Sequence, residues 1–169
     1  PLPRPSIDTG LGMDRITAVL QGGDSNYDTD LFQPIMRRTQ ELLGHDEATM
    51  RANSIPYRVI ADHSRALAFL IADGVMPGNE GRGYVLRMIL RRAAVRGRQL
   101  GFGGPFLAET AQAVIDTMGS HYTELVERGS FIREVISQEE ERFLDALDAG
   151  LVHLHRVIDR GVARGSRAV

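Results

Sequence analysis

The sequence contains neither cysteine nor lysine among its 169 residues. Without cysteine it can form no disulfides, no thiolate metal sites and no cysteine nucleophile. Without lysine it can form no Schiff base and has no P-loop lysine. Any bound phosphate would therefore be held by arginine side chains, which supply all 20 basic residues, and by backbone amides.

Long apolar runs are missing as well. No stretch approaches the roughly 18 residues that a membrane span requires, and the segment PLPRPSIDTG lacks the features of a signal peptide. We therefore expect a cytoplasmic protein with no membrane partner. The content of 43% hydrophobic and 25% charged residues is typical of a globular chain, and a net charge of -2 does not by itself indicate a nucleic-acid partner.

Apolar residues recur at helical spacing along most of the chain, and almost nothing alternates with a period of two residues. Glycines and prolines divide this pattern into expected helices at residues 11–20, 31–43, 56–74, 84–97, 106–118 and 121–160. Asp28 is a candidate cap for the second helix, and the last segment is either one long helix or two stacked helices interrupted at Gly129. We predict a mainly α fold, a helical bundle with at most one short strand at Ser6–Asp8.

Two glycines and an arginine stand at the junction between that strand and the first helix, in the segment Asp8-Thr9-Gly10-Leu11-Gly12-Met13-Asp14-Arg15. Glycine lets the backbone approach an anionic ligand, a helix N-terminus carries partial positive charge, and arginine adds a directed contact. The segment therefore suits a phosphate. A Gly-x-Gly turn beside a charged residue is nevertheless common, so this pattern is weak when taken alone.

Residues 82–98 hold arginines at positions 82, 87, 91, 92, 96 and 98 and no acidic residue. At about 100° per residue, Arg87, Arg91 and Arg98 fall within a stripe of about 40°. Two explanations remain open. The stripe contacts a phosphate backbone, or it pairs with acidic residues elsewhere in the fold, for which Glu139–Glu141, Asp145 and Asp148 are candidates.

The loop Pro77-Gly78-Asn79-Glu80-Gly81 comes directly before these arginines. Asn79 could cap the following helix. Alternatively, its carboxamide could reach a base edge, because it offers both a donor and an acceptor.

Together these stretches resemble the alanyl-tRNA synthetase family. PSIDTGLGMDRI is similar to that family's form of class II motif 3, and SNYDTDLF follows it closely. IADHSRALAFLIADGVMPGNEGRGYVLRMILRRAAVRG is similar to the family's acceptor-stem-binding signature. The resemblance implies a C-terminal remnant of the catalytic domain at 1–44, a linker at 45–54, and a truncated helical tRNA-recognition domain at 55–169.

The resemblance also implies roles for individual residues. Asp8 would hold the amino group of the substrate alanine. Gly10 and Gly12 would form the bottom surface of the aminoacyl-adenylate site, and Arg15 would contact ATP. Asn79 would read the G·U wobble pair of the tRNA-Ala acceptor stem from the minor groove, which is wide enough in RNA to enter. Acceptor phosphates would be held by Arg82, Arg87, Arg91 and Arg92.

The family's enzymes adenylate alanine with ATP and Mg²⁺ and then transfer it to tRNA. Class II motifs 1 and 2 should lie upstream of Pro1, and the second base-reading element and the editing domain with its zinc ligands should follow Val169. We therefore expect an internal fragment that has no complete active site, binds no cofactor or zinc, and is inactive alone. The alternatives are a stand-alone helical module that binds RNA or protein without catalysis, and a structural bundle in which Glu139–Glu141 neutralise the arginines.

Overall fold

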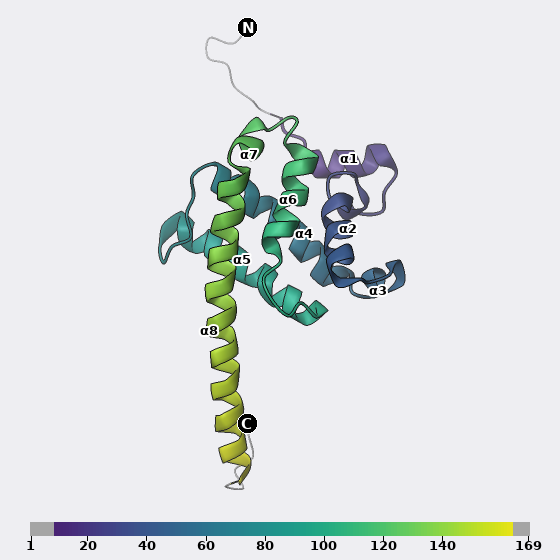
Figure 1. Cartoon of the computed structure of the whole chain (residues 1–169). Helices are drawn as coiled ribbons and strands as arrows, with labels where there is room; N and C mark the ends of the chain where they lie inside the picture. Colours follow the sequence, from purple (N-terminus) through teal and green to yellow (C-terminus); the bar gives the residue numbers. More distant parts are fainter. Residues whose placement is uncertain (1–8, 164–169) are drawn as a thin grey trace.

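The computed structural model describes residues 9–163, and the side chains of residues 9–160. Within this range every regular element is helical, which confirms the prediction of a mainly α fold (Figure 1). The elements are α1 (Met13–Gln21), η1 (Asn26–Asp28), α2 (Gln33–Leu43), α3 (Glu47–Ala52), α4 (Ser54–Ala72), α5 (Gly81–Leu100), α6 (Leu107–Met118), α7 (Thr123–Glu127) and α8 (Gly129–Ala163). The strand predicted at Ser6–Asp8 lies outside the described residues.

Helix α4 is the centre of the fold, because α2, α5, α6, α7 and α8 all pack against it. Its fully buried side chains include Tyr57, Ile60, Leu67 and Ile71. They belong to one hydrophobic cluster that also contains side chains from α2, α3, α5, α6, α7 and α8. Burial of this cluster is the main force that holds the helices together, since apolar surface removed from water contributes about 25 cal/mol per Å².

Helix α8 is much longer than the core that it covers. Its first three turns contribute Ile132, Val135 and Ile136 to the hydrophobic cluster, and Leu144 is the last buried residue along it. Every residue from 148 to 160 is exposed, and Figure 1 shows this part of α8 extending away from the other helices. None of the described helices is both long and apolar enough to cross a membrane.

A buried carboxylate joins α8 to α6. One side-chain oxygen of Glu140, Oε2, accepts hydrogen bonds from the backbone N–H groups of Phe106 and Leu107 at 3.1 and 2.9 Å. These N–H groups stand at the start of α6, where they have no partner within the helix. Burial raises the pKa of Glu140 to about 7, against the opposing effect of these two hydrogen bonds.

Two details of the helix boundaries differ from the prediction. Asp28 was wrongly predicted as the cap of α2. It ends the short helix η1, the buried Thr29 follows, and α2 starts at Gln33 with no side-chain cap. The predicted linker at residues 45–54 contains α3, whose first turn is capped by Asp46 through a 2.8 Å hydrogen bond from the backbone N–H of Thr49.

The segment 121–160 contains two helices, which is one of the two arrangements that the sequence allowed. Helix α7 ends at Glu127 and α8 begins at Gly129, so the interruption lies at Arg128. Further upstream, α5 begins at Gly81, three residues before the predicted start, and therefore includes Arg82 in its first turn. This extension places the arginines on one continuous helix.

Candidate functional site

An open cleft of about 660 Å³ lies where the start of α1 faces α4 and the end of α6. Its lining comprises Gly12, Met13, Asp14, Arg15, Asn26, Asp62, Arg65, Ala66, Phe69, Met118 and Tyr122. Of the residues predicted to bind ATP, Gly12 and Arg15 line the cleft and Gly10 does not. Asp8, predicted to bind alanine, lies outside the described residues.

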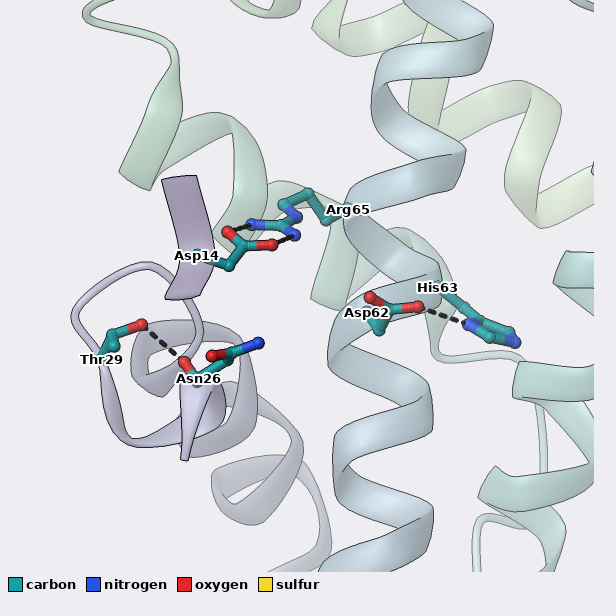
Figure 2. A network of polar contacts seen from close by, with 6 residues as sticks. All are labelled: Asp14, Asn26, Thr29, Asp62, His63 and Arg65. Carbon is teal, nitrogen blue, oxygen red and sulfur yellow. Dashed lines mark hydrogen bonds and ion pairs between the residues drawn. The ribbon is translucent and has the colours of Figure 1, made fainter. Parts of the chain in front are cut away.

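Asp14 and Arg65 fix one wall of this cleft (Figure 2). Nη1 and Nη2 of Arg65 donate to Oδ1 and Oδ2 of Asp14 at 2.9 and 2.7 Å, which is the two-point geometry that favours arginine with a carboxylate. The guanidinium carbon of Arg65 also lies 4.1 Å from the centre of the Phe32 ring. The hydrogen bond from Arg65 lowers the pKa of Asp14, so this carboxylate is held in its charged form.

Asp62 is the second carboxylate of the cleft. Its Oδ2 lies 3.2 Å from Nδ1 of His63, and Figure 2 shows both side chains on α4. The residues at 62, 65, 66 and 69 are spaced by three or four positions, so they form one face of the helix.

The Mg²⁺ that accompanies ATP in the resemblance would be held mainly by the phosphates, because Mg²⁺ in nucleotide sites takes only one or two protein carboxylates. Asp14 is bonded to Arg65 and Asp62 to His63, and residues 9–160 include no cluster of three acidic or histidine side chains that could hold a metal ion.

The two glycines at the entrance to α1 are not required by packing within the described chain. A Cβ atom added to Gly10 would meet nothing within 4 Å, and one added to Gly12 would meet only the side chain of Arg15, at 3.8 Å. Neither glycine has a positive φ. The backbone here is open to a ligand or to further polypeptide.

The arginine stripe on α5 faces α8 and is paired there. Nε of Arg87 lies 2.9 Å from Oε1 of Glu139, and Nη2 of Arg91 lies 3.2 Å from the same oxygen. Arg98 forms a 2.6 Å ion pair with Asp148. For these three arginines the structure shows acidic partners within the fold. Phosphate binding by Arg87 and Arg91 stays a prediction.

Arg82 and Arg92 differ from the three arginines of the stripe in exposure and in ion pairing. Both are exposed, and neither forms an ion pair with any residue in the range 9–160. Arg92 also lines a shallow groove of about 470 Å³ with Met88, Arg91, Val95, Arg96, Gln99 and Phe143. The guanidinium carbon of Arg91 lies 5.2 Å from the centre of the Phe143 ring, so this groove combines positive charge with an aromatic face.

Asn79 is exposed in the loop between α4 and α5. It does not cap α5, since Glu80 occupies that position and makes no side-chain capping bond. Instead, its Oδ1 accepts a hydrogen bond from Nη1 of Arg87. The loop is closed by a 3.1 Å hydrogen bond from the backbone N–H of Gly78 to the carbonyl of Gly83, and a Cβ on Gly83 would lie only 2.5 Å from the carbonyl oxygen of Met76.

Comparison with known proteins shows the family to which this chain is similar. Residues 1–166 match the family model for tRNA synthetases class II (A). The whole chain is 56% identical to the alanine–tRNA ligase of Roseiflexus sp. (strain RS-1), and 52% identical to those of Chloroflexus aurantiacus (strain ATCC 29366 / DSM 635 / J-10-fl) and Desulfosudis oleivorans (strain DSM 6200 / JCM 39069 / Hxd3). The chain belongs to the alanyl-tRNA synthetase family. It spans 19% of the length of each of these three relatives.

Within this alanyl-tRNA synthetase segment, Arg65 lines the cleft but was not predicted as a site residue. The sequence did contain a pattern that indicates such a role. Asp62, Arg65 and Phe69 place charged and aromatic side chains on one face of a helix that is otherwise largely apolar. Glu139 was recognised only as one of several acidic candidates. The structure singles it out, since it is the residue that both Arg87 and Arg91 contact.

Proposed function

We propose that this chain supplies the acceptor-stem-binding surface and part of the ATP site of an alanine–tRNA ligase. Its partners are the tRNA-Ala acceptor stem, ATP and alanine, and the parent enzyme works in the cytoplasm. The chain by itself binds RNA but does not activate alanine. The observation that carries the RNA-binding part is the exposure of Asn79 together with Arg82 and Arg92 on one loop and helix, α5.

The charges of this surface support contact with a phosphate backbone. Arg82 and Arg92 are separated by ten residues, which is about 15 Å along a helix axis. Both guanidinium groups are open to solvent and have no acidic partner in the described residues, so their charge is available to an RNA strand. Arg87 and Arg91, which share Glu139, contribute less free charge.

Asn79 suits base recognition because of where it stands. Its carboxamide is exposed at the tip of a closed loop, next to Arg82 in the first turn of α5. RNA minor grooves are shallow and wide enough for a loop to enter, and a wobble pair displaces the guanine amino group toward that groove. We assign to Asn79 the reading of the G·U pair.

The cleft at α1 supports the nucleotide part of the proposal. The exposed Arg15 and the unobstructed backbone at Gly10 and Gly12 stand at the start of α1, where backbone N–H groups and the helix dipole favour an anion. Asp8 would bind the amino group of alanine. Because the matching segment of the relatives is only 19% of their length, we expect no ATP–pyrophosphate exchange above a blank from the isolated chain.

Binding of the chain to an alanine acceptor minihelix tests the proposal. Fluorescence anisotropy is measured with a G·U minihelix and a G·C minihelix across a salt series. We expect binding that weakens as salt rises and prefers G·U by about 1 kcal/mol or more. Equal binding to both minihelices would contradict base reading by Asn79. Absence of binding would contradict the RNA-binding role and favour a structural bundle with neutralised arginines.

A further inference from the structure

Three side chains that contact one another connect the buried face of α8 with the exposed loop before α5. Glu139 on α8 is 4% exposed in its side chain, and Arg87 on α5 is 22% exposed. Arg87 in turn donates from Nη1 to Oδ1 of the exposed Asn79. The two contacts connect residues that lie 52 and 8 positions apart in the sequence.

Glu139 pairs with the Nε and Nη2 side of the Arg87 guanidinium. Nε lies 2.9 Å from Oε1 as a charge contact without hydrogen-bond geometry, and Nη2 donates a hydrogen bond to Oε2 at 3.4 Å. A guanidinium group is planar and rigid, so an ion pair and a hydrogen bond on one side also restrict the direction of the third nitrogen. The third nitrogen, Nη1, is the one that reaches Asn79.

The burial of Glu139 restricts the movement of the Arg87 side chain. A buried, charged carboxylate needs a cation or hydrogen-bond donors beside it, because leaving its charge unpaired is strongly unfavourable. Glu139 meets this requirement with Arg87 and Arg91, both from α5. Rotation of Arg87 away from Glu139 would leave only Arg91 on the carboxylate, so the position of Arg87 is strongly favoured.

A carboxamide that has no partner can turn over and exchange its oxygen for its nitrogen. These two ends have opposite hydrogen-bonding character, so a side chain that turns freely cannot discriminate between base edges. The hydrogen bond from Arg87 commits Oδ1 of Asn79 and leaves the amide nitrogen for a ligand. We propose that Glu139 is a positioning residue for base recognition, which holds Arg87 so that Arg87 orients the carboxamide of Asn79.

This inference rests on the proposed function of Asn79, and Arg91 supplies a matched control. Arg91 contacts the same carboxylate, on the same helix and one turn away, but makes no hydrogen bond to Asn79. Arg87→Gln and Arg91→Gln therefore remove the same charge and a partner of the same buried group. Only Arg87→Gln removes the contact to Asn79.

The test measures two properties of the full chain and of the variants Arg87→Gln, Arg91→Gln, Glu139→Gln and Asn79→Ala. The first is the preference for a G·U minihelix over a G·C minihelix. We expect Arg87→Gln, Glu139→Gln and Asn79→Ala to reduce it to within about twofold of unity, and Arg91→Gln to retain it. The second is the NMR signal of the Asn79 side-chain amide, which should move in Arg87→Gln and Glu139→Gln and stay in place in Arg91→Gln.

The two measurements distinguish a failure of the positioning role from a failure of the proposed function. An Asn79 amide signal that stays unchanged in Arg87→Gln and Glu139→Gln would overturn the positioning role, whatever the RNA data show. Retention of the G·U preference by both variants would overturn it as well. A wild-type chain with no G·U preference would instead contradict the proposed function, and with it the role of Glu139 in base recognition. If Glu139→Gln fails to fold, as judged by circular dichroism, Arg87→Gln tests the same contact from the more exposed partner.

Discussion

Asp14 on α1 and Arg65 on α4 are joined by two parallel hydrogen bonds of 2.9 and 2.7 Å, and this pair attaches the start of α1 to α4. The apolar side chains of α1 contribute little, since Ala18 is its only buried residue and Val19 and Leu20 are 73% and 79% exposed. The position of Arg15 in the cleft therefore depends on an ion pair.

We expect Asp14→Asn to release α1. The substitution removes the charge of a partly buried, two-point pair, which should cost about 1–3 kcal/mol of local stability. Hydrogen exchange of the α1 amides should accelerate, while exchange in α4 and α6 stays unchanged. Asp24→Asn is the control, because Asp24 is exposed and makes no side-chain hydrogen bond in the described residues. Equal protection of α1 in both variants would contradict the attachment.

The Asp14 pair also predicts sensitivity of α1 to acid. The pKa of Asp14 is lowered by the hydrogen bond from Arg65, so the stabilisation is present above the ordinary carboxyl pKa of 3.8 and is lost as the pH falls through the folded value. Amide exchange measured at successively lower pH should show α1 opening before the core. Asp14→Asn should lose this pH dependence.

Glu140 predicts a pH dependence of the opposite sign. Because its folded pKa is raised to about 7 from an ordinary value of 4.5, its contribution is fully present below 4.5 and is lost as the pH rises through 7. The corresponding free energy is roughly 3 kcal/mol at most. The contribution of Glu140 should make chemical unfolding at about pH 5 need more denaturant than unfolding at about pH 8.

Glu140→Gln isolates this effect. Its amide oxygen can still accept from the N–H groups of Phe106 and Leu107, so the start of α6 stays capped, but no proton is gained or lost. The difference in denaturant midpoint between the two pH values should shrink in Glu140→Gln and persist in Glu127→Gln, whose side chain is exposed. An unchanged difference in Glu140→Gln would show that another group is responsible.

Substitution of Gly97 tests how closely α5 packs against the ring of Phe106. A Cβ at this position would lie 2.1 Å from the ring of Phe106, which is itself stacked on Phe102 with 3.8 Å between ring centres. Gly97→Ala should therefore destabilise the fold by about 1–3 kcal/mol, although alanine is intrinsically the better helix former. Gly150→Ala is the matched control. Its added Cβ meets nothing within 4 Å, so this change should leave stability equal or raise it by up to about 1 kcal/mol in thermal unfolding.

The exposed and the paired arginines should differ in RNA binding. Arg82→Gln and Arg92→Gln should each weaken binding to G·U and G·C minihelices equally, and each should reduce the salt slope by about 1. Arg98→Gln should change the slope less, because Arg98 is already paired with Asp148 at 2.6 Å. Equal effects from all three substitutions would mean that ion pairing within the fold does not decide which arginines meet RNA.

Most of the helices could be predicted from the sequence. Their signals are local, since apolar spacing and terminal glycines depend only on neighbouring residues, and α2, α4 and α6 lie close to where this pattern places them. The short helix α3 was missed because six residues are too few for an apolar period to show, although Asp46 and Thr49 carried a capping pattern. The division of the chain into catalytic remnant, linker and tRNA-recognition domain stays a prediction.

The candidate site was only partly predictable. The sequence indicated Gly12, Arg15 and Asn79 through their resemblance to family motifs, and the structure places the first two at one cleft and the third on an exposed loop. It did not indicate that Arg65 would complete the cleft, because Arg65 lies 51 positions from Asp14. Contacts over such distances follow from packing, which local patterns do not describe.

The sequence by itself determined the family, the helical class and the concentration of positive charge on α5. Only the tertiary structure decided which arginines are neutralised. Arg87, Arg91 and Arg98 meet acidic residues about 50 positions away because α8 packs along that face of α5, whereas Arg82 and Arg92 point to solvent. Helical periodicity sorts residues onto faces, but the partner of each face depends on the burial of apolar surface by the whole chain.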